Sequence, residues 1–334
     1  MDEREFLAAD LGGLIAAELT DEVAAGLPAV YSYLVQDPYG ERWLGPTVAE
    51  LFPMAGSGVT VGAGVIALLH ALAGLAGRDP VYVLGDVYPD LPHWMVAAGG
   101  RCVSRFDFGN ADDADHAGNV AACGARLVLI ERPALTGPTM DLPRLRTFCA
   151  SLPAGVAVLV DESYANYHPP AYSAVPLTAD LPNLAVVRGL AKGYGLGGIR
   201  VGYCVSSAGL TDRVRALVPP MLAASLSLRL ARAVLALGDV TGPLRARIAQ
   251  VRAETLELFE RAGIVGAQPA GEHIPFMFFD DEGDPGPTRL RAAGVLGKRH
   301  NYWSERRRTA AYRYRISLPL RAERMASLRA RLTA

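Results

Sequence analysis

Residues 183–207 read NLAVVRGLAKGYGLGGIRVGYCVSS, and this stretch decides the fold. It begins and ends with short apolar runs, NLAVVRG and GIRVGYCVSS, which are typical of strands buried on both faces. Between the two runs lies a glycine-rich segment with Lys192, one of two lysines in a chain whose 33 basic residues are otherwise arginine. A lysine kept in such apolar, glycine-lined surroundings is a candidate functional residue.

The alternation of apolar strands and helices continues on the N-terminal side of this stretch. Strands are predicted for GVTVGAG, PVYVLGD, RCVSRFDF, ARLVLIERP and VAVLVDE, with helices between most of them. This pattern predicts a mostly parallel sheet covered by helices on both faces. Residues 211–262 are predicted to be helical, and the tail returns to strands and helices. We therefore expect an α/β large domain over residues 45–210 and a smaller α+β domain from residues 1–44 and 211–334.

Composition narrows the class of protein. The chain has 334 residues and a formal net charge of −1 without a long basic stripe, which argues against nucleic-acid binding. Its most apolar run, residues 64–77, is shorter than the roughly 20 residues that a membrane span needs. The N-terminus lacks the apolar core of a signal peptide. The four cysteines lie far apart without a C-x-x-C pair, which suits reduced thiols and gives no zinc motif. We therefore expect a soluble, cytoplasmic protein that binds neither nucleic acid nor membrane.

Several residues near the ends of the predicted strands belong together chemically. Asp161 ends the run VAVLVD, and Tyr164 follows it, at the sheet edge where α/β proteins bind ligands. Residues 62–64, Gly-Ala-Gly, open a helix, a turn that favours a phosphate, as does the nearby Arg200. Together with Lys192 they fit pyridoxal phosphate. A lysine amine forms a Schiff base with its aldehyde, and a buried carboxylate keeps its ring nitrogen protonated.

At these residues the chain resembles the class I and II aminotransferases of fold type I, especially the branch similar to histidinol-phosphate aminotransferase. NLAVVRGLAKGYGLGGIRVGY is similar to the Schiff-base segment of that family, and VLVDESYANY to its Asp-x-x-Tyr strand. VTVGAG resembles its phosphate turn, and YRYRISLP resembles its C-terminal strand with the substrate arginine. The resemblance covers residues 37–334. It implies a pyridoxal-phosphate-dependent aminotransferase that works as a homodimer, with sites at the subunit interface.

The resemblance implies a role for each matching residue. Lys192 would carry the cofactor and shuttle a proton, Asp161 would pair with the pyridine nitrogen, and Tyr164 would donate to the phenolic oxygen. Tyr88 would stack on the ring, and Arg315 would clamp the substrate α-carboxylate through two hydrogen bonds. The phosphate would be bound by Gly62, Ala63, Gly64 and Arg200.

Three positions depart from the family pattern. Ala134, in ERPALTG, stands where the family usually has an asparagine that contacts the phenolic oxygen. Gly189 and Ala191 replace the hydroxyl residues that usually precede the lysine. Two side-chain contacts to the phosphate are therefore expected to be absent. Tyr33 and Tyr39 are both candidates for the tyrosine that such enzymes lend to the partner subunit.

Two alternatives to transamination stay open. The same cofactor chemistry serves decarboxylation, elimination, cyclisation and oxidation, and the altered ERPALTG turn lies close to that choice. The other alternative is a non-catalytic sensing lobe, although the chain has no length left for the DNA-binding region that such proteins usually append. The segment at 296–308, LGKRHNYWSERRR, either lines the entrance to the site or forms a solvated loop.

Overall fold

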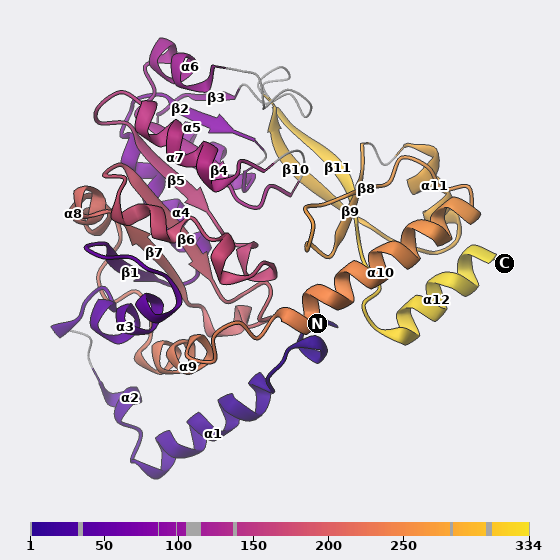
Figure 1. Cartoon of the computed structure of the whole chain (residues 1–334), viewed down its shortest axis with the longest axis horizontal. Helices are drawn as coiled ribbons and strands as arrows, with labels where there is room; N and C mark the ends of the chain where they lie inside the picture. The colour runs from indigo at the N-terminus through magenta and orange to yellow at the C-terminus, as the bar shows by residue number, and fades with distance from the viewer. Residues whose placement is uncertain are drawn as a thin grey trace.

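Two sheets organise the chain. A computed structural model describes residues 2–32, 36–85, 87–97, 99–104, 115–135, 139–280, 283–304 and 309–333; the side chains of Asp2, Ser104 and residues 300–312 lie outside that description. One sheet has seven strands, in the order β1-β7-β6-β5-β4-β2-β3, and the other has four, in the order β10-β11-β9-β8. The four-stranded sheet lies to one side of the larger one, together with α10 and α12 (Figure 1).

The seven-stranded sheet is mostly parallel, as predicted. Its strands are β1 (Gly58–Gly62), β2 (Val81–Leu84), β3 (Cys102–Ser104), β4 (Leu127–Glu131), β5 (Ala157–Asp161), β6 (Leu184–Gly189) and β7 (Gly202–Ser206). β2 to β6 pair in parallel, whereas β7 is antiparallel to both β1 and β6. Because β7 runs the opposite way, its first residue Gly202 lies beside Gly62 and Gly189, the last residues of β1 and β6. Arg200, two residues before β7, therefore lies at the edge where the parallel strands end.

Helices cover both faces of this sheet. One face carries α3 (Glu41–Leu51), α6 (His116–Cys123), α7 (Leu142–Ser151) and α9 (Ser225–Leu235), and the other carries α4 (Val65–Leu72), α5 (Asp90–Ala97) and α8 (Ala208–Leu217). Strand side chains alternate between the two layers: Val128 and Ile130 pack in the first, Leu127 and Leu129 in the second. Since both layers are apolar, the strands are continuous apolar runs.

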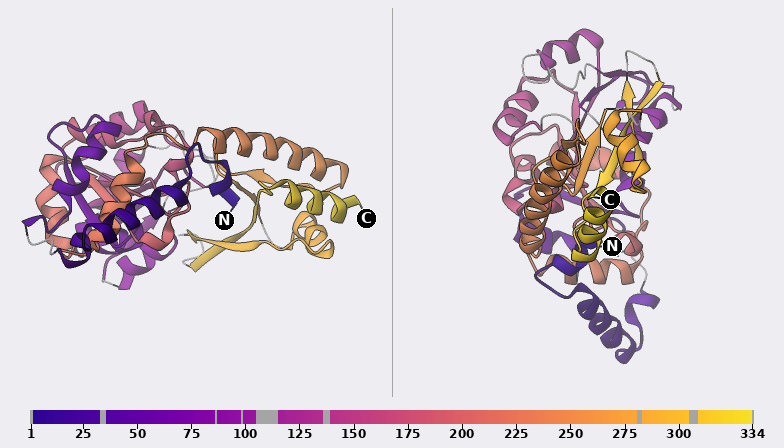
Figure 2. Two further views of the ribbon diagram at one scale, coloured as in Figure 1. Left: turned by 90° about the horizontal axis from the view of Figure 1, so that it is seen from below. Right: turned by 90° about the vertical axis from the view of Figure 1, so that its right-hand side faces the viewer.

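The smaller sheet has its own apolar cluster. Its elements are α10 (Gly242–Arg261), β8 (Gln268–Pro269), β9 (Phe276–Phe279), α11 (Pro285–Ala292), β10 (Lys298–Ser304), β11 (Thr309–Ser317) and α12 (Ala322–Thr333). α10 lies along one face of the sheet (Figure 2). The cluster also takes in Tyr164 and Tyr167 from the loop after β5, so the two sheets meet beside the predicted site. Within the segment 296–308, residues 298–304 form β10 and pair with β11 instead of forming a solvated loop, and residues 305–308 lie outside the described residues.

The N-terminal segment contacts both parts of the molecule. It forms the 3₁₀ turn η1 (Asp2–Phe6), then α1 (Leu11–Ala24) and α2 (Pro28–Tyr31), which lie along the outside of the molecule near α9 (Figure 1). Leu11 of α1 belongs to the apolar cluster of the large sheet, whereas Phe6 and Leu7 pack against the cluster of the smaller sheet. The division of the chain at residues 45–210 stays a prediction. None of the described helices is both long and apolar enough to cross a bilayer.

The remaining short 3₁₀ turns connect these elements. They are η3 (Ala73–Ala76), η4 (Ala165–Tyr167), η5 (Pro170–Tyr172), η6 (Val175–Ala179) and η7 (Gly197–Ile199). Three of them, η4, η5 and η6, follow β5 directly and fill the connection to β6. η7 separates Lys192 from β7.

Candidate active site

A cavity of about 240 Å³ lies where the parallel strands of the large sheet end. Its walls come from the segments that follow β1, β2, β5 and β6, from the end of β4 and from the residues just before β7. The sequence-predicted residues that line it are Gly64, Tyr88, Asp161, Tyr164, Lys192 and Arg200. Residues far apart in the chain therefore meet at one place, as the strand-end argument predicts.

Asp161 is the last residue of β5, and its side chain is 5% exposed. Its Oδ1 accepts hydrogen bonds from the backbone N–H (2.8 Å) and the hydroxyl (2.6 Å) of Ser163. Burial raises the pKa of Asp161, while the Ser163 bonds and the charge of Lys192 lower it. A buried carboxylate held in this way is stabilised by a cation placed beside it. The protonated nitrogen of a pyridine ring is such a cation.

Lys192 follows β6 by three residues, and its Nζ lies 4.9 Å from the centroid of the Tyr164 ring. Burial lowers the pKa of Lys192, and the charge of Arg315 lowers it further, although Asp161 raises it. A lowered pKa increases the fraction of neutral amine, the form that attacks an aldehyde.

The glycines around Lys192 are required by close packing. A Cβ at Gly193 would lie 2.9 Å from the backbone oxygen of Asn166, and one at Gly189 would lie 2.6 Å from Cγ2 of Val65. A hydroxyl side chain at Gly189 would therefore collide with the first turn of α4. The departure from the family pattern at this position follows from the tight approach of α4 to β6.

Arg200 and the start of α4 form the basic end of the cavity. Arg200 Nη2 donates to the Ala63 carbonyl at 3.1 Å, and a Cβ at Gly64 would lie 2.7 Å from the same nitrogen. The Arg200 backbone is left-handed, with φ of 53°, a conformation that costs a non-glycine residue about 1–3 kcal/mol and that is typical of functional sites. The guanidinium therefore lies against the phosphate turn that the sequence predicts.

The phosphate turn itself differs from its sequence prediction in one respect. The Gly64 N–H donates to the Gly62 carbonyl at 2.8 Å, so this amide is already engaged. Gly62 and Ala63 are not among the cavity-lining residues, whereas Val65 and Ile66 are. The first amides of a helix have no partner within the helix, and the helix dipole favours an anion there. Val65 and Ile66 are therefore better placed for a phosphate than Ala63 and Gly64.

Tyr164 and Arg315 join the two sheets beside Lys192. Arg315 lies close enough to Tyr164 to lower its pKa, against the larger effect of burial, and the Arg315 guanidinium lies 4.3 Å from the centroid of the Phe276 ring. The Tyr164 ring stacks on Tyr167 at 6.3 Å and meets Phe276 edge-on at 6.1 Å. Burial raises the pKa of Tyr164, so its hydroxyl stays protonated and able to donate.

Comparison with known proteins settles the family. The family model described as "Aminotransferase class I and II" matches residues 42–332. The chain belongs to this family. The resemblance that the sequence motifs carry is thereby confirmed.

Curated relatives and solved structures agree with this membership. "Histidinol-phosphate aminotransferase 1" of Cupriavidus pinatubonensis is 32% identical over 194 residues, which are 56% of this chain and 50% of that protein. The "aromatic amino acid aminotransferase" of Cutibacterium acnes is 27% identical over 270 residues, 78% of this chain and 74% of that protein. The first alignment thus spans half the length of that relative.

The solved structures show the fold. Histidinol-phosphate aminotransferase from Sinorhizobium meliloti, solved in complex with pyridoxal-5'-phosphate, superposes with a TM-score of 0.73 at 21% identity, covering 96% of this chain and 85% of that one. L-threonine-O-3-phosphate decarboxylase from Porphyromonas gingivalis superposes with a TM-score of 0.71 at 15% identity, covering 94% and 96%. Fold type I is therefore confirmed.

The donor set of this class I/II chain fits pyridoxal phosphate. A buried carboxylate at Asp161 suits a ring cation, the amine of Lys192 suits an aldehyde, and Arg200 with the start of α4 suits a phosphate. Tyr88 adds an aromatic ring, 5.8 Å from Trp94. Burial, followed by a hydrogen bond with Asp90, raises the pKa of Tyr88 to about 12, so it stays neutral.

Glu131 is a cavity residue that the sequence motifs do not indicate. It ends β4, pairs in register with Asp161 on β5, is 7% exposed and lines the cavity. Its charge raises the pKa of both Tyr164 and Lys192. The run ARLVLIE ends in an acid as VAVLVD does, and neighbouring parallel strands end at one edge. That pattern was the available signal.

Tyr33 and Tyr39 are the two candidates for the tyrosine expected to reach a partner subunit. Tyr33 lies outside the described residues. Tyr39 donates its hydroxyl to the Arg215 carbonyl at 3.0 Å, and the Arg215 guanidinium lies 5.3 Å from its ring. Tyr39 is therefore held within its own chain.

Proposed function

We propose that this chain is a pyridoxal-phosphate-dependent aminotransferase of amino-acid metabolism. It would transfer an amino group between an amino acid, or a related primary amine, and a keto acid. The observation that carries the proposal is the meeting of Lys192, its pKa lowered by burial, with the buried Asp161 carboxylate in one cavity whose far end is basic. When bound, the cofactor supplies an aldehyde that condenses with amines and a cationic ring that takes up electrons from the substrate Cα.

The residues around the cavity would divide the work. Lys192, as a neutral amine, would take the proton from the substrate Cα and would later return it to the former aldehyde carbon of the cofactor. Asp161 keeps a proton on the ring nitrogen. Tyr164, protonated because it is buried, donates towards the phenolic oxygen. Tyr88 covers a face of the ring.

Two basic groups would hold the anionic parts. Arg200, together with the amides of Val65 and Ile66, holds the phosphate. Arg315 pairs with the substrate carboxylate. Arg315 is near enough to Lys192 for its charge to lower the pKa of that amine, and its stacking on Phe276 orients the planar guanidinium.

Reductive labelling tests this proposal directly, because the chain contains one other lysine. Purified protein loaded with pyridoxal phosphate is treated with borohydride, digested and analysed by mass spectrometry. The pyridoxyl mass is expected on Lys192 and absent from Lys298, whose side chain is exposed. Lys192→Ala should lose the label and reduce turnover by about 10²–10⁴-fold, as removal of a general acid–base group does. Lys298→Ala should keep both. A label on Lys298 alone, or none, would sink the proposal.

Product analysis separates transamination from the other outcomes. With an amino acid and a keto-acid acceptor, the proposal expects one new keto acid and one new amino acid in equal amounts. Release of carbon dioxide or ammonia instead would indicate a decarboxylase or eliminase on the same fold. The observation that keeps this alternative open is Ala134, whose side chain offers no contact to a phenolic oxygen.

We also propose a homodimer in the cytoplasm. Helices α1 and α2 carry exposed apolar side chains, with Val23 at 64%, Val30 at 54% and Tyr31 at 78% exposure, which suit burial against a second copy. All four cysteines are free, as in a reducing compartment. Light scattering on the purified protein measures its molar mass, and a monomer at micromolar concentration would contradict the dimer.

A further inference from the structure

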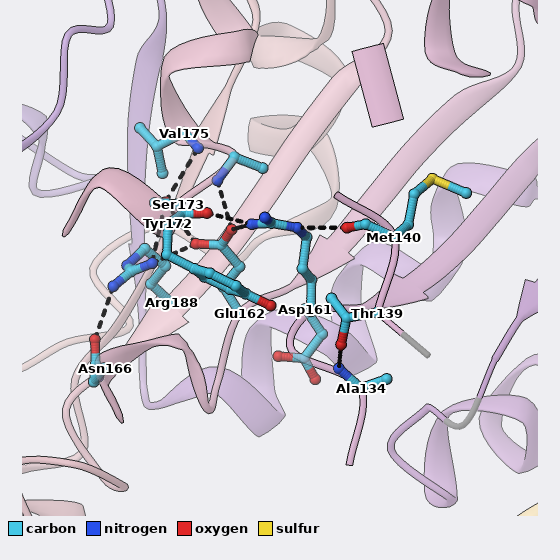
Figure 3. A network of polar contacts seen from close by, with 12 residues as sticks. Ala134, Thr139, Met140, Asp161, Glu162, Asn166, Tyr172, Ser173, Val175 and Arg188 are labelled. Carbon is cyan, nitrogen blue, oxygen red and sulfur yellow. Dashed lines mark hydrogen bonds and ion pairs between the residues drawn. The ribbon is translucent and has the colours of Figure 1, made fainter. Parts of the chain in front are cut away.

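Glu162, the residue after Asp161, lies on the other side of the strand end from the cavity. Its side chain is 0% exposed, and it forms ion pairs with Arg132 (Oε1 to Nη1, 3.3 Å) and with Nη1 of Arg188. Consecutive residues of an extended chain face opposite sides. Asp161 accordingly turns its carboxylate away from this group of ion pairs (Figure 3).

Every strong acceptor position of Glu162 is used. The hydroxyl of Ser173 donates to Oε2 at 2.6 Å, and the backbone N–H of Ala174 donates to Oε1 at 2.6 Å. Together with the two arginines, these donors fix the carboxylate rigidly. An ion pair at such depth is often no more stabilising than apolar packing of the same volume, because both charges lose their hydration. Apolar residues could match the stability of these ion pairs, but they would not hold the two arginines in fixed directions.

One end of this network holds the turn that contains Ala134. Arg132 Nε donates to the Met140 carbonyl at 2.9 Å, which closes the turn at its base. The Ala134 N–H donates to Oγ1 of Thr139 at 2.9 Å (Figure 3). The backbone position of this turn is therefore set by Arg132, and through it by Glu162.

The other end holds the loop that carries Lys192. Arg188 Nη2 donates to Oδ1 of Asn166 at 2.9 Å, and the Asn166 amide nitrogen donates to the Gly189 carbonyl. A Cβ at Gly193 would lie 3.1 Å from Cβ of Asn166, so the lysine loop rests directly on this side chain. The three strand ends that carry Ala134, Asp161 and Lys192 are therefore joined through one carboxylate.

We propose that Glu162, acting through Arg188 and Asn166, is a positioning residue that sets the placement of Lys192 relative to Asp161. This inference rests on the proposed function, because it concerns the same two groups. Glu162 touches neither cofactor nor substrate. It acts by fixing the backbone on both sides of the cavity.

Two variants and a matched control test the inference. Asn166→Ala breaks the link to Gly189 while leaving both ion pairs, and Glu162→Gln removes the central charge. The control is Glu22→Gln on α1, a second glutamate at 1% exposure, which also binds an arginine (Arg229, 2.6 Å) and the backbone N–H of Ala29. None of these three residues lines the cavity. Each protein is loaded with pyridoxal phosphate, and four quantities are measured: kcat, KM, thermal midpoint and the pH midpoint of the cofactor absorbance.

The expected result separates positioning from stability. Asn166→Ala should lower kcat by about 10- to 100-fold with little change in KM, as sub-ångström misplacement does. It should also move the pH midpoint of the absorbance by about half a unit, because the surroundings of the Lys192 nitrogen change. The folded Glu162→Gln protein should show the same fall in kcat and the same shift of the pH midpoint. Glu22→Gln should lose thermal stability but keep the wild-type kcat and pH midpoint.

The opposite outcome is equally clear. If Asn166→Ala keeps the wild-type kcat and midpoint and loses only thermal stability, as the control does, the network is structural and the inference is overturned. That result leaves the proposed function standing. A wild-type protein that takes no pyridoxyl label on Lys192 would overturn both together.

Discussion

Asp161 and Glu162 are adjacent in the chain, but their carboxylates face opposite sides of the strand end and have different partners. Glu162 meets two arginines, a hydroxyl and a backbone N–H, all from this chain. Among the described residues, the side-chain carboxylate of Asp161 accepts hydrogen bonds from Ser163 alone, and burial raises its pKa. The carboxylate on one side of the strand end is matched by two ion pairs, whereas the carboxylate on the cavity side forms none among the described residues and feels the charge of Lys192.

The basic residues of β6 and its loop repeat this contrast. Arg188 is buried and paired with Glu162. Lys192, four residues later, has a pKa lowered by burial and lies over the Tyr164 ring. Asp161 without an ion pair to any described residue and Lys192 with a lowered pKa, both in one cavity, are typical of a reactive site. The paired Glu162 and Arg188 are typical of the structure that supports such a site.

Among the substitutions that test this contrast, Asp161→Asn should have the largest effect. This change keeps the size of the side chain and removes its charge, so the ring nitrogen of the cofactor loses the anion that holds its proton. We expect kcat to fall by about 10²–10³-fold, the usual cost of losing one stabilising group in a site. Steady-state kinetics of the loaded enzyme measure it. Ser163→Ala, which removes a hydroxyl bond to the same carboxylate, should have a much smaller effect; an equal loss in both variants would contradict the role of the charge.

A smaller effect is expected from Arg315→Lys. A lysine keeps the positive charge but loses the planar pair of donors, so the KM for an amino acid should rise by about 10- to 100-fold. Arg313→Lys, two residues earlier on β11, is the control. Arg313 is buried, forms an ion pair with Asp280 and donates to Gln268 at 3.1 Å, so its variant should lose stability without a change in KM. An unchanged KM in Arg315→Lys would remove Arg315 from the substrate site.

The smallest effect concerns a histidine on the Glu162 side. His168 stacks on Tyr172 at 4.0 Å, and the Arg132 guanidinium lies 4.0 Å from the centroid of the same Tyr172 ring. Burial, then the charges of His273, Arg132, Arg245 and Arg188, lowers the pKa of His168 to about 3 from its usual 6.5. Between these values the unfolded chain binds a proton that the folded chain does not. Stability is therefore complete above the usual pKa and falls as the pH drops below it.

The variant His168→Phe should remove this dependence. The contribution of His168 amounts to at most about 1.4 kcal/mol of unfolding free energy per pH unit. Urea unfolding at about pH 7 and about pH 5 measures how the free energy of unfolding changes with pH. This change should be smaller for His168→Phe than for the wild type. His70→Phe, at an exposed position, should keep the wild-type pH dependence of the unfolding free energy. An unchanged pH dependence in His168→Phe would show that His168 is not buried in its neutral form.

Strands that are buried on both faces could be predicted, because such strands have continuous apolar sequences. β5 and β6 are continuous apolar runs because helices cover both sides of them. β10, KRHNYWS, carries no such pattern and is a strand because β11 pairs with it along its whole length. Strand preference of this kind depends on the neighbour rather than on the residues themselves.

Lys192, Asp161, Tyr164, Gly64, Tyr88 and Arg200 were predictable because each stands at or near the end of a recognisable strand, and the ends of parallel strands share one edge. The amino-acid order alone thus determined the family, the cavity edge and the chemical groups brought to it. The tertiary structure alone decided that Glu131 joins Asp161 in the cavity while Glu162 turns away to two arginines. The reason is physical: which acid meets which base depends on strand register and on the side that each residue faces, and the partners come from segments far apart in the chain.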